Sequence, residues 1–206
     1  MAGPQMLQFY IASGKAWQKG PGVGILHHGG GAYWLYTHAE ATPPPGEEAC
    51  RRAIACVESV LRGWNLSYTS GLRAALLRVH QEEREREEET ALGITCALLR
   101  AGQIYLAQAG PTLACIWGGG QLELVAPADP RPLGSDAEPQ VHLHRHQVAA
   151  GDVFLMASAS LSRLVTRAGI EALLSSGMDQ AARDIYRLAR EEASFSALLL
   201  SPAYLE

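Results

Sequence analysis

The sequence predicts an α+β fold built on mainly antiparallel strands. Short apolar runs occur in pairs separated by glycine-containing turns, at residues 23–37, 92–110 and 113–125. Such pairs are typical of β-hairpins. Two longer segments, 47–64 and 70–89, repeat apolar residues at helical spacing. With 206 residues that are 48% hydrophobic, the chain can bury one sizeable core, so we expect a single domain over residues 1–206.

The chain is predicted to open with a strand, a loop and a hairpin. Residues 6–12 have strand composition, and residues 13–22 contain three glycines and a proline, which favour a loop. The short runs 23–28 and 32–37 flank Gly29-Gly30-Gly31 and are expected to pair through that turn.

Two helices follow the hairpin. Glu47 and Glu48 suit the first turn of a helix, and apolar residues continue at helical spacing at Ala53, Val57, Val60, Leu61 and Trp64. The second helix, over about 70–89, carries Leu72, Leu76 and Val79 and ends in a charged run at 81–89. We expect this run to be a solvated helix end with some pairing of Glu and Arg four residues apart. The alternative is an acidic docking surface for a basic partner.

Two further hairpins and a histidine-bearing strand are predicted next. The strands of the hairpins are residues 92–100, 103–110, 113–117 and 122–125. In the strand 140–148, the two-residue period places His142, His144 and His146 on one face. Three aligned imidazoles could hold zinc or another borderline metal. No Asp, Glu or Cys nearby is an evident fourth ligand, so we expect the solvated face of an edge strand.

The C-terminal part alternates strands with helices. An apolar run at 153–157 reads as a buried strand, followed by a helix with Ser158 or Ser160 as its N-cap and apolar residues at Leu161, Leu164 and Val165. Helices at 170–174 and 178–192 and a strand at 195–200 complete the chain.

Composition narrows the function classes. A net charge of −4 gives no broad attraction to nucleic acid or to an anionic membrane, and there is no apolar run long enough for a span and no signal-peptide pattern. The cytoplasm is the default compartment, where the four scattered cysteines are expected to be small reduced core residues. We therefore expect a protein or small-molecule partner.

Aspartate is absent from the first 128 residues and occurs only at Asp129, Asp136, Asp152, Asp179 and Asp184. Hard divalent cations in hydrolytic sites are usually held by short carboxylates on rigid turns. The N-terminal part of the chain therefore has little with which to build such a site.

Several blocks together resemble the type 2C, metal-dependent protein serine/threonine phosphatases, the PPM family, with the block order of its bacterial members. Residues 151–165 resemble its G-D-x-x-L-L-x-S-D-G-L-x-D-x-V block. Residues 35–53 resemble V-A-D-G-x-G-G-H-x-x-G-E-x-A-S-x-x-A and keep Gly46, Glu47 and Ala49. Residues 92–124 resemble its G-T-T and G-D-S-R meander, and 193–200 its closing D-N segment.

The resemblance implies a four-layer α-β-β-α sandwich of two mainly antiparallel sheets flanked by helices. The helical flap that the family carries near its substrate is expected to be missing, since only residues 126–131 precede Pro132-Leu133-Gly134. In the family, two metal ions held by aspartates and one backbone carbonyl share the water that attacks the phosphoryl group.

The positions that correspond to the metal-binding motifs lack acids. Thr37 and His38 replace the Asp-Gly pair, Gly110-Pro111-Thr112-Leu113 replaces G-D-S-R, Ala159 replaces the Asp of S-D-G, and Phe195 stands in the closing motif. We therefore expect no catalytic, cofactor-binding or metal-binding residues of the family kind. No P-loop, G-x-S-x-G or H-E-x-x-H motif points to another enzyme class.

The function expected from the sequence is a catalytically inactive phosphatase-like module in signalling. Its partner would be a protein, and the family suggests a kinase or a phosphoprotein. One alternative is a divergent phosphatase with a rebuilt metal site made from His27, His28, His38, Glu40 and Glu47. Another is a structural homo-oligomer that uses the sheet edge and the strand His142 to His146 as its interface.

Overall fold

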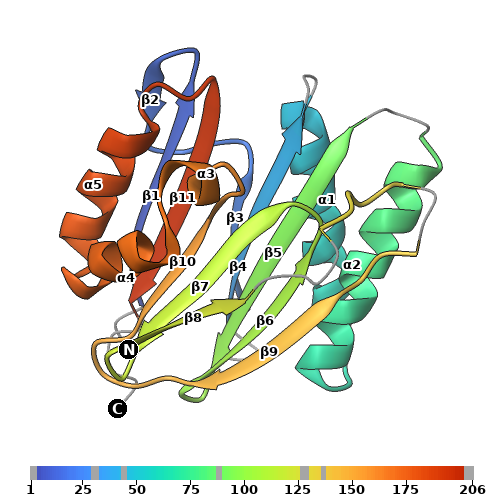
Figure 1. Cartoon of the computed structure of the whole chain (residues 1–206). Helices are drawn as coiled ribbons and strands as arrows, with labels where there is room; N and C mark the ends of the chain where they lie inside the picture. The colour runs from blue at the N-terminus through green and yellow to red at the C-terminus, as the bar shows by residue number, and fades with distance from the viewer. Residues whose placement is uncertain are drawn as a thin grey trace. The chain divides into compact units, whose positions relative to one another are not determined.

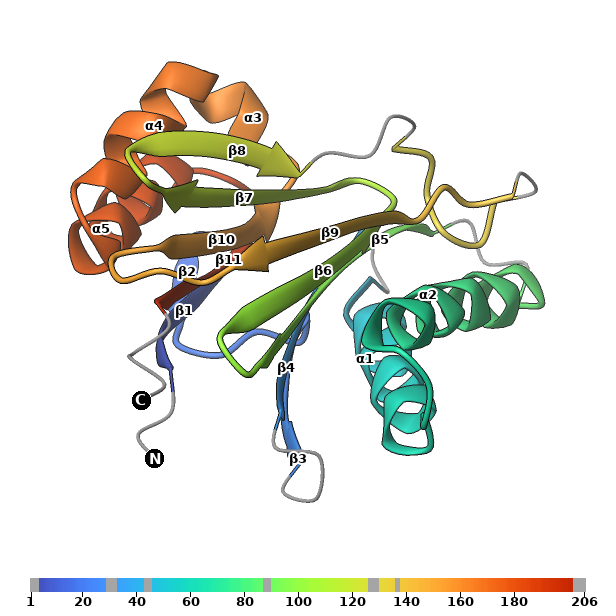
Figure 2. The ribbon, with the colours of Figure 1, turned by 90° about the horizontal axis from the view of Figure 1, so that it is seen from below.

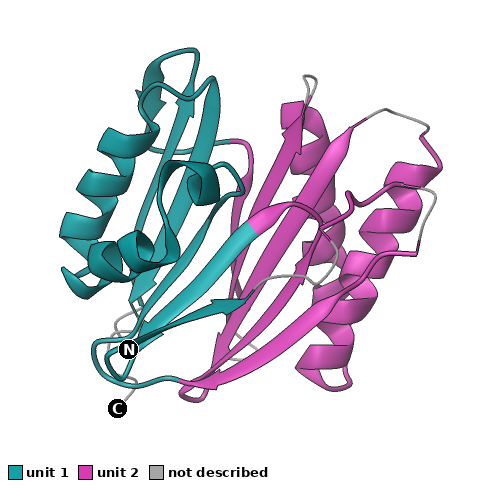
Figure 3. Cartoon of the chain, viewed as in Figure 1, with its two compact units in different colours: residues 1–20, 113–125, 148–206 teal, residues 21–112, 126–147 magenta. Residues whose placement is uncertain are grey.

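The computed structural model describes residues 4–28, 33–42, 46–86, 90–125, 130–135 and 138–201 (Figure 1). The predicted turn Gly29-Gly30-Gly31, the prolines at 43–45 and the connection at 126–129 lie outside these ranges. Within these ranges the chain forms two antiparallel sheets and five helices, as the sequence predicts. These residues form two compact units (Figure 3).

Unit 2 comprises residues 21–112 and 126–147 and holds the five-stranded sheet, in the order β3-β4-β5-β6-β9. The strands are β3 (Val23–His28), β4 (Tyr33–Thr42), β5 (Ala91–Arg100), β6 (Gln103–Ala109) and β9 (His142–Gln147). The helices are α1 (Gly46–Arg62) and α2 (Tyr68–Arg84). Figure 2 shows α1 and α2 side by side, and both cover the same face of this sheet.

The core of unit 2 forms where the apolar stripes of the two helices meet alternate residues of the strands. Leu35 of β4 and Cys96 of β5 lie in it, together with Val57, Leu72 and Leu76 of the helices. Alternate strand residues necessarily point to the opposite face. This alternation decides which of the polar residues described below share a surface.

Unit 1 comprises residues 1–20, 113–125 and 148–206 and holds the six-stranded sheet, in the order β2-β1-β11-β10-β7-β8. The strands are β1 (Gln5–Ala12), β2 (Lys15–Trp17), β7 (Thr112–Gly118), β8 (Gln121–Val125), β10 (Val153–Ser158) and β11 (Ser194–Ser201). The helices are α3 (Leu161–Leu164), α4 (Arg167–Ser175) and α5 (Met178–Ala189). Their apolar residues pack on one face of the sheet, against Ile11, Leu155, Phe195 and Leu199 among others.

Three local predictions are wrong. The loop predicted at 13–22 contains β2, which pairs with β1 through a turn at Ser13 and Gly14. The helix predicted after Ser160 is only α3, because Val165 is extended and Thr166 starts α4 by accepting a hydrogen bond from the Gly169 N–H at 3.2 Å. The third concerns α2, which ends at Arg84, well before residue 89.

The segment before β9 is held against β5 and α2 by its backbone. Leu133 is buried and donates its N–H to the Leu92 carbonyl at 2.7 Å, and the Gly134 N–H donates to Nδ1 of His80 at 3.1 Å. Residues 130–135 and 138–141 form no helix. Within the ranges described above, no helix has the length and apolar content needed to cross a bilayer.

Candidate functional site

A row of polar residues crosses unit 2 on the face of the sheet that α1 and α2 do not cover. His38 of β4 is in register with Thr95 of β5, which is in register with Gln108 of β6, and Gln108 pairs with His142 of β9. His38, Thr95 and Gln108 are fully buried, and His142 is half-buried. Buried polar side chains usually need hydrogen-bond partners.

Thr112 supplies those partners for two members of the row. Its hydroxyl lies 2.9 Å from that of Thr95, and Nε2 of Gln108 donates to its carbonyl oxygen at 2.6 Å and to its hydroxyl at 3.0 Å. The preceding turn depends on Gly110, which has φ +74° and would place a Cβ 2.5 Å from the Leu92 carbonyl oxygen. The cluster of Thr95, Gln108 and Thr112 is therefore held by neutral groups.

Thr37 and His38, which the sequence places together at a metal-binding motif, lie on opposite faces of the sheet. Thr37 is in register with Cys96 inside the helix-covered core. Burial raises the pKa of the Cys96 thiol to about 12, and a hydrogen bond with the Thr37 side chain opposes that shift. The expectation that Thr37 stands in the site is thus wrong, because neighbouring strand residues alternate. His38 stands eight residues before Gly46, as the aspartate does before the glycine of G-E in the family motif.

The structure gathers only two of the five residues proposed for a rebuilt metal site. His38 and Glu40 alternate along β4 and share one face. Glu47 is on α1, where it forms an ion pair with Arg51 at 3.2 Å. The rings of His27 and His28 stack instead on Trp34 at 4.3 Å and on Tyr33 at 5.3 Å, centroid to centroid.

In unit 1, the turn Ser158-Ala159-Ser160 has a structural bonding pattern. The buried Ser158 Oγ accepts a hydrogen bond from the backbone N–H of Ser196 at 2.9 Å, which ties the end of β10 to β11. Ser160 precedes α3 but makes no side-chain capping bond. Ser160 is thus the N-cap residue of α3, one of the two predicted, although its side chain makes no capping bond, and Ala159 offers no ligand atom in its side chain.

Phe195 does not occupy the place of a metal ligand, contrary to expectation. It lies in the helix-covered core of unit 1 and stacks on Phe9 at 5.9 Å between centroids. Ser196, the next residue, is on the other face of β11. As with Thr37, the sequence motif identifies the segment, and the strand alternation decides which residue points out of the core.

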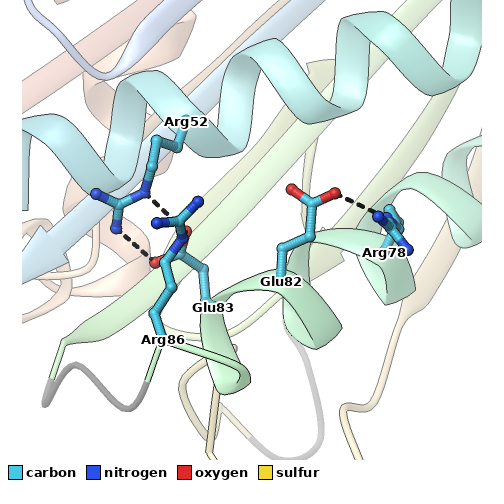
Figure 4. Close-up of polar contacts among 5 residues, drawn as sticks. All are labelled: Arg52, Arg78, Glu82, Glu83 and Arg86. Atoms are coloured by element: carbon cyan, nitrogen blue, oxygen red, sulfur yellow. Dashed lines mark hydrogen bonds and ion pairs between the residues drawn. The ribbon is translucent and has the colours of Figure 1, made fainter.

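The buried acids of the described chain are Glu83 and Asp152, and both stabilise backbone or helix packing. The Asp152 carboxylate accepts a hydrogen bond from the Ala149 N–H at 2.8 Å, across the turn before β10. Glu83 accepts two hydrogen bonds from Arg52 of α1, at 3.2 and 2.9 Å, with Arg86 at 3.8 Å (Figure 4). The charged run at 81–89 is thus not wholly solvated, because Glu83 anchors α2 to α1.

The three histidines of β9 share one face, as predicted, but it is not the solvated one. His142, His144 and His146 are half-buried, whereas the alternating Leu143, Arg145 and Gln147 are exposed. His144 and His146 are in register with Leu106 and Ile104 of β6, which are themselves buried. The histidine face is therefore continuous with the face of the polar row.

The family's pair of hard divalent cations does not fit the residues present. Such ions need several carboxylate oxygens to offset the cost of their dehydration. The polar row offers imidazole, hydroxyl and amide groups, and the turn at 158–160 offers hydroxyl groups. Glu40 is the carboxylate next to the row on β4, and one carboxylate is too few for two such ions.

The sequence matches no protein-family model and no curated protein, whereas its structure matches solved ones. A serine/threonine phosphatase of S. agalactiae superposes with a TM-score of 0.76 at 14% identity, over 97% of this chain and 100% of that one. The phosphatase Stp1 of Staphylococcus aureus gives 0.77 at 15% identity, over 98% and 95%. PppA of Pseudomonas aeruginosa, described as a key regulatory component of T6SS, gives 0.69 at 18% identity, over 98% and 99%.

The chain has the fold of bacterial serine/threonine phosphatases. The family resemblance read from the sequence is thereby supported at the level of fold. On this phosphatase-like fold, the residues that sequence reasoning missed are Thr95 and Gln108. Each is a polar residue at an alternate position of a strand that is otherwise largely apolar, 91–100 for Thr95 and 103–109 for Gln108. That signal marks a position needing a hydrogen-bond partner without naming the partner.

Proposed function

We propose that residues 1–206 act as one catalytically inactive, phosphatase-like domain that binds a protein partner in a signalling or regulatory complex. The observation that carries the proposal is the neutral network of Thr95, Gln108 and Thr112. The hydroxyls of Thr95 and Thr112 and the amide nitrogen of Gln108 are bonded to one another without a cation. The Asp and Ser positions of the G-D-S-R motif are Pro111 and Thr112 in this chain. This segment therefore offers no carboxylate to a metal, and Thr112 forms structural hydrogen bonds instead.

The remaining motifs support the same proposal. His38 replaces a carboxylate by an imidazole, and Ala159 and Ser196 bring no acid. Two divalent cations would lose their water ligands on binding at such residues, and there are too few carboxylates to offset that free-energy cost. No catalytic step through a metal-bound water is therefore proposed for this chain.

The fold is retained although the metal-binding acids of the family are absent, which favours a role in binding a partner over a role in catalysis. Both cores are densely filled with apolar residues, so the scaffold is maintained although the acids are not. The P. aeruginosa structure with the same fold is described as regulatory. A kinase, a phosphoprotein or another component of a bacterial signalling complex is the class of partner we propose.

The test is hydrolysis by the purified chain. We expect no manganese-dependent release of phosphate from p-nitrophenyl phosphate or from a phosphothreonine peptide, with or without chelator. Hydrolysis that requires Mn²⁺ and is abolished by chelator would overturn the proposal. Affinity capture from the source cell followed by mass spectrometry then identifies the partner, with a Thr112→Val variant that retains its fold as a comparison.

A divergent phosphatase with a rebuilt site is the second candidate, because His38 and Glu40 share a face of β4. It predicts stoichiometric metal by elemental analysis, lost in both His38→Ala and Glu40→Gln but retained in Glu47→Ala. A structural homo-oligomer is the third candidate, since β9 lies at the edge of its sheet. A stable dimer on size-exclusion chromatography would support it, and a clean monomer would count against it.

A further inference from the structure

Two histidines of β9 are placed as a pair of ligands. The ring centroids of His144 and His146 lie 6.5 Å apart with an interplanar angle of 26°. A ring nitrogen of one lies within 4.8 Å of a ring nitrogen of the other. The two side chains leave the same face of one strand, whose backbone pairs with β6 from Gln103 to Gln108.

The separation is close to what one metal ion requires. Zinc binds imidazole nitrogen at about 2.0–2.1 Å in tetrahedral geometry, which sets two such nitrogens about 3.4 Å apart. Small side-chain rotations that move the nitrogens together by about 1.4 Å or less would suffice. Because the backbone that carries both residues lies in a paired strand, the ligands are largely preorganised.

We propose that His144 and His146 form a two-histidine site for a borderline divalent cation, with zinc as the representative ion. Imidazole suits zinc, copper and nickel, whereas magnesium, calcium and manganese prefer oxygen ligands. The selectivity is therefore opposite to that of the family's aspartate sites. The proposal goes beyond the proposed function and does not depend on whether the chain hydrolyses phosphate.

The surroundings agree with a site of moderate affinity. The guanidinium of Arg145 lies on the other face, over the ring of Tyr105 at 5.8 Å, so that its charge is directed away from the pair. Ile104 and Leu106 flank the histidines in register and partly exclude water. With two protein ligands and the remaining positions left to water, the dissociation constant should lie in the micromolar range.

The cysteines are poor competitors for the ion. Burial raises the pKa of Cys50, Cys96 and Cys115 to about 12 and that of Cys56 to about 11. Only thiolates bind zinc strongly, and at neutral pH these thiols are protonated. Zinc that binds to the native chain should therefore be bound by histidine and not by cysteine.

Isothermal titration calorimetry of the full chain with ZnCl₂ tests the site. We expect one equivalent to bind, at least about tenfold more weakly in His144→Gln and in His146→Gln, and within about twofold of wild type in His142→Gln. His142 is the matched control because it lies on the same face of the same strand but is not one of the proposed ligands. MnCl₂ should give no comparable heat.

Circular dichroism checks that each variant is folded, and ring ¹⁵N shifts of His144 and His146 in the wild type provide a reading independent of substitution. Those shifts should move on addition of zinc, while those of His27 and His28 should not. Absence of zinc binding by the wild type at about 1 mM, equal binding by all variants, or a loss in His142→Gln as large as in His144→Gln would each overturn the proposal.

Discussion

Replacing Arg52 with methionine should destabilise the chain much more than replacing Arg78 with methionine. Both arginines make ion pairs with glutamates of α2, at 2.9 Å for Arg52 with Glu83 and 2.7 Å for Arg78 with Glu82 (Figure 4). The pairs differ in burial, since the Glu83 side chain is 7% exposed and that of Glu82 is 34% exposed. Arg52 also joins two helices, whereas Arg78 pairs within one turn of α2.

The magnitude follows from what each substitution leaves behind. Removing one partner of a fully buried pair costs about 3–5 kcal/mol, because the other charge stays buried. Glu83 would keep Arg86 at 3.8 Å, and Arg52 is itself 21% exposed, so we expect a loss of about 2–3 kcal/mol for Arg52→Met. At about 3 °C per kcal/mol for a chain of this size, Tm should fall by about 6–9 °C. Arg78→Met should cost about 0.5 kcal/mol or less.

Urea unfolding followed by circular dichroism measures both variants. The double variant Arg52→Met/Glu83→Leu should recover most of the loss, because apolar groups that replace a whole buried pair are often neutral for stability. If Arg52→Met costs no more than Arg78→Met, the reasoning that Glu83 is a desolvated charge is refuted.

Three further predictions concern the polar row, the segment before β9 and the thiols. Thr112→Val removes the hydroxyl that Thr95 and Gln108 contact, and it should lower the free energy of unfolding by about 1–2 kcal/mol in urea titrations; a variant as stable as wild type would contradict the network. Burial, followed by the charge of Arg84, lowers the pKa of His80 below 6.5, so the unfolded chain binds this proton more tightly than the folded chain. The stability from neutral His80 is complete above pH 6.5 and is lost as the pH falls through the lower folded pKa. Unfolding midpoints at pH 7.5 and 5.5 should therefore diverge more in wild type than in His80→Asn, and equal divergence would be the opposing result. No thiol of the native chain should react promptly with Ellman's reagent at pH 8, whereas all four should react in urea, because burial raises the pKa of Cys50, Cys56, Cys96 and Cys115.

Much of the fold follows from local patterns in the sequence. Period-two apolar runs with glycine turns predicted the strands from 92 to 125, and helical spacing after Glu47 predicted α1, because each signal depends on neighbouring residues alone. The short strand β2 gave no such signal. Its three residues are all exposed, and pairing with β1 rather than composition makes them a strand.

The sequence by itself also determined that the phosphatase-like motifs lack their acids, since this needs only block order and residue identity. Only the tertiary structure decided which residues of those motifs face away from the cores. Adjacent residues of a strand point in opposite directions, and the helices of each unit determine which direction is the core. His38 and Ser196 are therefore on the faces of their sheets that the helices do not cover, while Thr37 and Phe195 are in the helix-covered cores. Arg52, the partner of Glu83, likewise comes from a helix distant in sequence, and Thr112, the partner of Gln108, lies in β7 beyond the turn at Gly110, so neither strand nor helix periodicity specifies these contacts.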